Sequence, residues 1–155
     1  MSDVIITEKP AMTLVGMHHR GPYPEMGVVY QKVAGIISQH GLWPQIQGAI
    51  GAAWDNPDLV AVADLRSFAG FHVADDFNAP EGLDLLHLQG GEHAELLHIG
   101  PYEGLRSVYG YLMGDWFPKS GRQHADAPTY EIYLNDPTTT APVDLKTLIC
   151  APLAA

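Results

Sequence analysis

The chain has 155 residues, of which 46% are hydrophobic and 17% charged, a composition typical of one globular domain. Its formal net charge is −10 and its eight Lys and Arg residues form no basic run, which argues against direct nucleic-acid binding and favours organic cations. The single cysteine, the lack of a signal-peptide pattern and the lack of a membrane-length apolar run predict a cytoplasmic protein with no membrane partner.

An internal repeat organises the sequence. His19-Arg20-Gly21-Pro22-Tyr23 is matched 79 residues later by His98-Ile99-Gly100-Pro101-Tyr102. Further along, Asp64-Leu65-Arg66-Ser67 is matched by Asp144-Leu145-Lys146-Thr147 in the same order. We therefore predict a single domain built from two copies of one module. Its parts are the first copy at 11–73, a surface loop at 74–91 and the second copy at 92–152, within a domain of residues 1–155.

Each copy has the pattern of a strand, a helix and two further strands. The first strand ends at Gly-Pro, apolar residues then recur at helical spacing, and two strands follow around an Asn-Pro or Asp-Pro turn. The expected strands are 12–19, 49–55 and 63–73 in the first copy and 92–99, 129–135 and 144–151 in the second. The first helix should stop near Gly41 and the second before Pro118 and Gly121. This order predicts an α+β fold of tandem βαββ modules with pseudo-twofold symmetry, an antiparallel sheet and two main helices.

The third element differs between the copies. Side chains alternate along a strand, so Glu131 and Tyr133 share one face of their strand. The equivalent positions of the first copy hold Gly51 and Ala53, which have almost no side chain. This asymmetry predicts a concave space between the copies with a single acid inside it.

The opposite face of these two strands carries larger residues. We expect that face to pack against the helices, because its side chains are mostly apolar. Its members are Ile50, Ala52 and Trp54 in the first copy and Tyr130, Ile132 and Leu134 in the second.

A lone carboxylate at Glu131 is costly to bury, by at least several kcal/mol without a partner. A ligand cation can be that partner, or the carboxyl group can stay protonated and act as a general acid. The alternative is that Glu131 lies on an open sheet face in contact with water.

The sequence also resembles the GyrI-like small-molecule-binding family over nearly its whole length. The matching segments are Arg20-Gly21-Pro22-Tyr23, Asp64-Leu65-Arg66, His98-Ile99-Gly100-Pro101-Tyr102, Trp116-Phe117-Pro118, Tyr130-Glu131-Ile132-Tyr133-Leu134-Asn135 and Pro152-Leu153. That family includes effector-binding domains of BmrR-type and Rob-type transcription regulators, stand-alone DNA gyrase inhibitors and relatives of cyclopropanoid hydrolases. The resemblance implies the tandem βαββ fold and assigns Glu131 as the central pocket glutamate.

The chain departs from the regulators at its start. It begins about ten residues before the first expected strand, which leaves no room for a DNA-binding helix pair. We therefore expect a stand-alone form of the domain.

Three functions fit these observations, and the first is a binding module for a planar, apolar or cationic small molecule. Its pocket would use Glu131, Tyr133, the small residues Gly51 and Ala53, and aromatic residues of the second helix. Tyr109 and Trp116 are the helix residues that we expect to line it.

The second is a hydrolase that opens cyclopropanoid DNA-alkylating toxins, with Glu131 as general base or acid and Tyr133 orienting the substrate. The third is a protein-interaction module whose acidic surface acts on a partner such as gyrase.

Other candidate sites are weaker. His18 and His19 are adjacent, so they point to opposite faces of a strand, and we expect no metal and no cofactor. Cys150 lies in an apolar run and is expected to be a buried small hydrophobe. Tyr23 and Tyr102, which follow the Gly-Pro turns, fit either turn anchors or pocket-rim residues.

Overall fold

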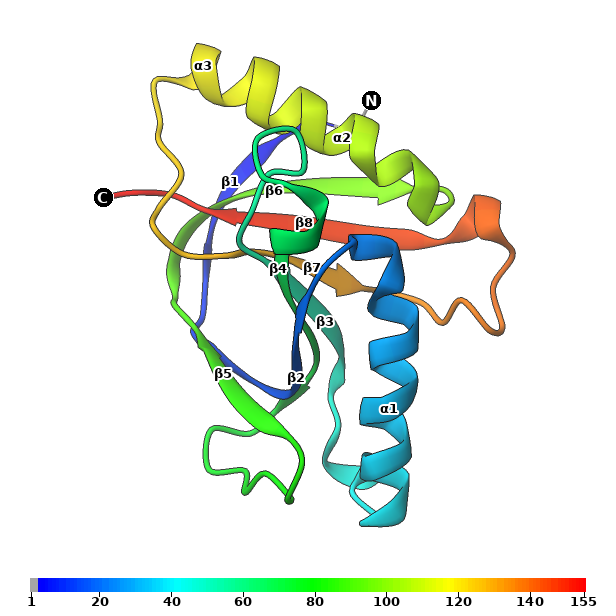
Figure 1. Cartoon of the computed structure of the whole chain (residues 1–155). Helices are drawn as coiled ribbons and strands as arrows, with labels where there is room; N and C mark the ends of the chain where they lie inside the picture. Colours follow the sequence, from blue (N-terminus) through cyan, green and yellow to red (C-terminus); the bar gives the residue numbers. More distant parts are fainter. Residues whose placement is uncertain (1–2) are drawn as a thin grey trace. The chain divides into compact units, whose positions relative to one another are not determined.

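The computed structural model describes residues 3–155 and divides them into two compact units, coloured along the chain in Figure 1. The first unit comprises residues 11–89, and the second comprises 3–10 together with 90–155. Each unit has an antiparallel sheet and one main helical segment, which confirms the predicted α+β class. The pseudo-twofold relation between the copies stays a prediction.

The first unit places a long helix on a four-stranded sheet with strand order β3-β4-β2-β5. Its elements are β2 (Met12–Arg20), α1 (Met26–Gln39), β3 (Gly48–Ala53), β4 (Arg66–Val73) and β5 (Asp84–Leu88). The helix ends where expected, because Gly41 takes the left-handed backbone conformation with φ +64°.

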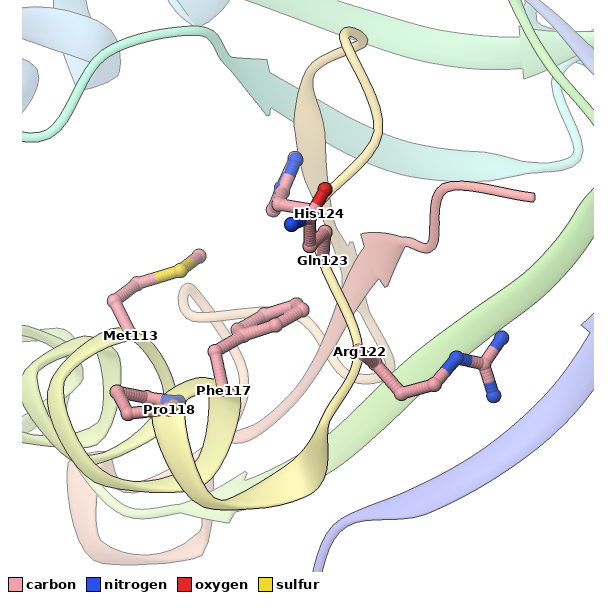
Figure 2. A pocket seen from close by; sticks show the side chains of 6 residues that line it. All are labelled: Met113, Phe117, Pro118, Arg122, Gln123 and His124. Atoms are coloured by element: carbon pink, nitrogen blue, oxygen red, sulfur yellow. The ribbon is translucent and has the colours of Figure 1, made fainter.

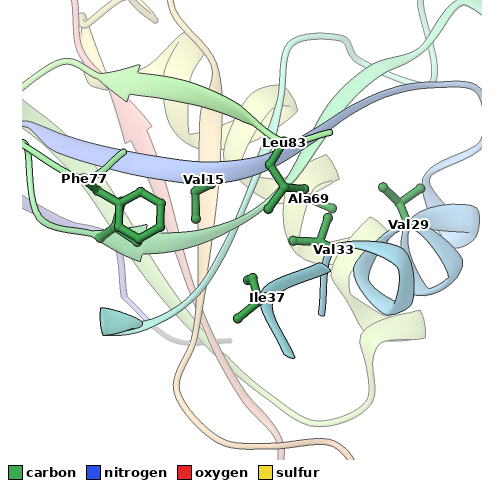
Figure 3. Close-up of a cluster of buried hydrophobic side chains, with 8 residues drawn as sticks. Val15, Val29, Val33, Ile37, Ala69, Phe77 and Leu83 are labelled. Atoms are coloured by element: carbon green, nitrogen blue, oxygen red, sulfur yellow. The ribbon is translucent and has the colours of Figure 1, made fainter. Parts of the chain in front are cut away.

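The buried stripe of α1 explains its position on this sheet. Val29, Val33 and Ile37 recur at helical spacing and are at most 8% exposed. They pack against a cluster on the sheet that includes Val15 and Ala69 (Figure 3). Full burial of one such side chain contributes about 1.5–3 kcal/mol, so this interface holds the helix in place.

The second unit repeats the arrangement with strand order β1-β6-β8-β7. Its elements are β1 (Ile5–Lys9), β6 (Gly91–Ile99), α2 (Leu105–Tyr111), a short π-helix (Leu112–Trp116), α3 (Phe117–Ser120), β7 (Thr129–Tyr133) and β8 (Lys146–Pro152). In Figure 1 the segment from α2 to α3 runs as one continuous helical rod.

The helical segment continues through Pro118, the first of the two residues expected to follow it. Pro118 lies in the first turn of α3, directly after the π-helix. A proline is tolerated there, because its missing backbone N–H would have no partner in the helix. The helical segment instead ends at Gly121, whose φ is +71°.

The turn after the first strand is the same in both units. The backbone N–H of Gly21 donates to the Leu65 oxygen at 2.8 Å, and that of Gly100 donates to the Leu145 oxygen at 2.8 Å. Both glycines have a positive φ, +136° and +140°, which other residues rarely adopt. The repeated Gly-Pro-Tyr sequence therefore encodes one repeated backbone turn.

Two strands lie where the sequence predicted none. Segment 74–91, expected to be a loop, contains β5, which pairs with β2 and buries Leu88 to 4% exposure. The first strand of the chain begins at Ile5 and not near residue 12, because β1 pairs with β6. Both are short strands beside the first strand of a copy, so backbone pairing holds them without a strong apolar pattern.

The predicted strand faces were inverted with respect to the helices. Gly51 is paired with Ala69, which packs in the cluster under α1, so the small-residue face of β3 is the helix side. Ile50 and Ala52 point to the other face and are still only 2% exposed. Both faces of the strand are covered, so residue size did not reveal which one meets the helix.

Candidate functional site

The second unit places a carboxylate between two phenols. Glu131 and Tyr133 lie two residues apart on β7, and Tyr109 reaches them from α2. The Tyr109 hydroxyl donates to Glu131 Oε2 at 2.6 Å, and the Tyr133 hydroxyl donates to Oε1 at 2.9 Å. Each carboxyl oxygen therefore has one phenol donor, and together they fix the orientation of the group.

Burial raises the pKa of the Glu131 carboxyl above its ordinary value. The hydrogen bonds from Tyr109 and Tyr133 lower the pKa of Glu131, as does its electrostatic interaction with His98, because each stabilises the ionised form. The result is a carboxyl group whose proton is held more tightly than in water. Such a group suits either the binding of a cation or proton transfer.

Close packing beside the site depends on one glycine. A Cβ at Gly104 would lie 2.9 Å from His98 Cε1, too close for any side chain there without a shift. The His98 ring is in turn hydrogen-bonded through Nε2 to the Pro101 oxygen at 2.9 Å. This packing holds His98 at the start of the helical segment that carries Tyr109.

Tyr102 and Tyr23, which the sequence left undecided, have different contacts. The Tyr23 hydroxyl donates to the backbone oxygen of Asp55 at 2.7 Å, so Tyr23 is a turn anchor. The Tyr102 ring packs edge-on against Tyr133, with ring centroids 5.8 Å apart, and Tyr102 is 36% exposed. Burial raises the pKa of Tyr102, and the negative charge of Glu131 raises it further.

The predicted site residues are therefore brought together only in part. Glu131, Tyr133 and Tyr109 are in contact, whereas Trp116 packs against Phe117 at 5.0 Å and against the core of the second unit. Gly51 and Ala53 lie on β3 of the first unit, and their place in a ligand pocket stays a prediction.

Thr147 lies beside the site but was not among the predicted site residues. In the sheet register it stands between His98 on β6 and Tyr133 on β7, on the same face as both. It is fully buried, and its hydroxyl has no hydrogen-bond partner within residues 3–155. The internal repeat was the signal that could have indicated it, because Thr147 is equivalent to Ser67. The Ser67 hydroxyl, unlike that of Thr147, has a partner, since it donates to the Met26 sulfur at 3.0 Å.

A separate hollow of about 340 Å³ opens beside the end of the helical segment. Figure 2 shows Met113 and Phe117 projecting from the helix toward the loop that carries Gln123 and His124. Arg122 at its border is paired with Glu92 at 2.7 Å, and His124 is held by Thr129 at 2.7 Å. The side chains of Arg122 and His124 are thus engaged within the unit.

Cys150 is buried, as expected, and burial raises the pKa of its thiol to about 12, so it is a poor nucleophile. Among residues 3–155 no three His, Cys, Asp or Glu side chains gather as metal ligands would. In the same part of the chain, no helix has both the length and the apolar character required to cross a membrane.

Comparison with known proteins identifies the family. The model of the GyrI-like small molecule binding domain matches residues 2–154. The chain belongs to this family. It is therefore a GyrI-like small-molecule-binding domain, and the resemblance seen in its sequence motifs is confirmed.

Several known proteins are similar to this chain in sequence or in fold. A DNA gyrase inhibitor of Serratia proteamaculans is 34% identical over 143 residues, covering 86% of this chain and 87% of the relative. The C-terminal domain of EcmrR has a TM-score of 0.77 at 17% identity and covers 99% of this chain and 98% of its own.

A further solved structure, SAV2435 bound to tetraphenylphosphonium, has a TM-score of 0.72 at 14% identity. It covers 99% of this chain and 94% of its own. At these identities the two solved structures establish the shared fold.

Proposed function

We propose that this domain binds a bulky organic cation, with Glu131 as the central acid of the site. One observation supports this most directly: a carboxyl group buried enough to raise its pKa is held by Tyr109 and Tyr133 at 2.6 and 2.9 Å. Two phenols only partly offset the cost of burying the charge. A ligand cation supplies the remaining compensation.

The chemistry of the surrounding side chains supports the same ligand class. Tyrosine rings attract cations through their faces, and three tyrosines gather around this carboxylate. The chain as a whole has a net charge of −10, which favours the approach of cations. A protein of the same fold, SAV2435, is bound to tetraphenylphosphonium, which is such a ligand.

Calorimetry with tetraphenylphosphonium tests the proposal. We expect Glu131→Gln to weaken binding by about 1–3 kcal/mol while the protein stays folded. Glu8→Gln is the matched control, since it removes the same charge from an exposed position of β1 and should leave affinity unchanged. Equal affinity in wild type and Glu131→Gln would show that the cation binds elsewhere.

We propose hydrolysis as the second candidate function, supported by the raised pKa of Glu131. A carboxyl group of this kind can serve as general acid or base, with Tyr133 orienting a cyclopropanoid alkylator for attack by water. A protein of the same fold, at 16% identity and a TM-score of 0.66, is described as a hydrolase from Listeria innocua.

The expected result is ring-opened product over many turnovers, and Glu131→Gln should reduce the rate by about 100-fold or more. Recovery of intact alkylator in stoichiometric complex would refute turnover and leave binding as the function.

We also propose gyrase as a candidate protein partner, because relatives up to 34% identical are named DNA gyrase inhibitors. A supercoiling assay with purified gyrase tests this directly. Undiminished supercoiling at a large excess of the domain would exclude it.

A further inference from the structure

The two Gly-Pro-Tyr turns share a backbone but use their tyrosines differently. In the first unit the Tyr23 hydroxyl is held by the Asp55 oxygen at 2.7 Å and approaches the Arg66 oxygen at 3.4 Å. In the second unit the Tyr102 ring packs on Tyr133, and the Tyr102 hydroxyl has no hydrogen bond to residues 3–155. One copy of the tyrosine therefore anchors a loop and the other does not.

The loop of the second unit is held without a hydrogen bond from its tyrosine. It is tied by Asn135, whose amide donates to the Asp144 oxygen and whose oxygen accepts from the Lys146 N–H, both at 2.9 Å. The backbone bond from Gly100 closes the turn itself. The first unit has the equivalent bond, from the Arg66 N–H to Asp55 Oδ2 at 2.8 Å, so the two loops differ in the tyrosine hydroxyl, which bonds to the loop only in the first unit.

The freed ring lies beside the acid instead. Tyr102 packs edge-on against Tyr133, and the Tyr133 hydroxyl donates to Glu131 at 2.9 Å. A continuous series of groups thus runs from solvent, through two aromatic rings, to the carboxylate. With 36% of Tyr102 exposed, part of the ring remains available for contact with a ligand.

We propose that Tyr102 is a ligand-contacting residue, whose ring forms the outer aromatic wall of the Glu131 site and selects bulky cations over small ones. This inference depends on the proposed function of that site. The carboxylate supplies the charge that any cation needs, whereas Tyr102 supplies apolar and cation–π contact that only a large cation reaches. Tyr102 therefore sets selectivity, and Glu131 sets the requirement for charge.

Calorimetry on three variants separates these roles, with tetraphenylphosphonium and tetramethylammonium as the large and small probes. Tyr102→Leu should weaken tetraphenylphosphonium binding by about 3- to 30-fold and change tetramethylammonium binding by less than about twofold. Tyr102→Phe keeps the ring and should bind both probes like wild type. Glu131→Gln should weaken both.

The outcomes also distinguish the two proposals. If Tyr102→Leu binds tetraphenylphosphonium like wild type while Glu131→Gln binds it weakly, the role of Tyr102 is overturned and cation binding stands. If wild type binds neither probe, both proposals are overturned.

A chemical measurement reports contact independently of affinity. Cys150 is the single cysteine and is buried, so Tyr102→Cys introduces one reactive thiol on the proposed wall. Saturating tetraphenylphosphonium should slow alkylation of that thiol several-fold. Val143→Cys, at a residue 69% exposed in the same unit, is the control and should react at an unchanged rate. Unprotected alkylation of the thiol in Tyr102→Cys at saturation would overturn the inference.

Discussion

Removal of one phenol donor should raise the pKa of Glu131 further. Tyr109→Phe keeps the ring but deletes the hydroxyl that lies 2.6 Å from Oε2. A hydrogen bond to a charged acceptor is worth about 1.5–3 kcal/mol, so its loss destabilises the ionised carboxylate and raises its pKa. Tyr133→Phe should act in the same direction but less, because its hydroxyl lies 2.9 Å from Oε1.

Carbon-detected NMR titration of the Glu131 side-chain carboxyl measures this change directly. Tyr111→Phe is the matched control, since it removes a phenol from the same helix and should leave the pKa unchanged. An unchanged or lowered pKa in both Tyr109→Phe and Tyr133→Phe would refute the view that these phenols stabilise the ionised form.

Four further predictions follow from the structure. Cation affinity should rise with pH through the raised pKa of Glu131, and Glu131→Gln should abolish that rise in calorimetry. As pH rises from the ordinary pKa of a glutamate to the raised pKa of Glu131, the free energy of unfolding of the wild type should fall relative to that of Glu131→Gln. The reason is that the folded state holds the Glu131 proton more tightly than the unfolded state does. Thr147→Val should raise the free energy of unfolding in urea by about 1–2 kcal/mol, because its hydroxyl is buried without a partner, whereas Ser67→Ala should not. Gly16→Ala should destabilise the fold by about 3 kcal/mol or prevent folding, since its Cβ would lie 1.9 Å from a backbone oxygen of β4. Gly27→Ala is the control, because its Cβ would meet no atom within 4 Å, and thermal melts should show that it is tolerated.

The sequence predicted the main elements well where local rules act. Apolar spacing located α1, and the Gly-Pro-Tyr repeats located two identical turns. Strand alternation correctly put Glu131 and Tyr133 on one face. These features depend on residues close together in the chain, so a single sequence carries their signal.

Non-local contacts were less predictable. The strand β5 was missed because an edge strand is held mainly by backbone pairing with β2, which side-chain patterns report weakly. The helical segment continues past Pro118 directly after a π-helix at Leu112–Trp116. A π-helix has no clear sequence signature, so this continuation was not predictable.

The sequence alone determined that the chain is a duplicated βαββ domain of the GyrI-like family with one distinctive acid, Glu131. Only the tertiary structure decided which side chains meet that acid, because hydrogen bonds to a carboxylate require donors within about 3 Å and depend on helix–sheet packing. That packing put Tyr109 and Tyr133 on Glu131, and not Trp116. It also placed the Tyr102 ring against Tyr133, whereas the equivalent Tyr23 bonds to its loop through its hydroxyl.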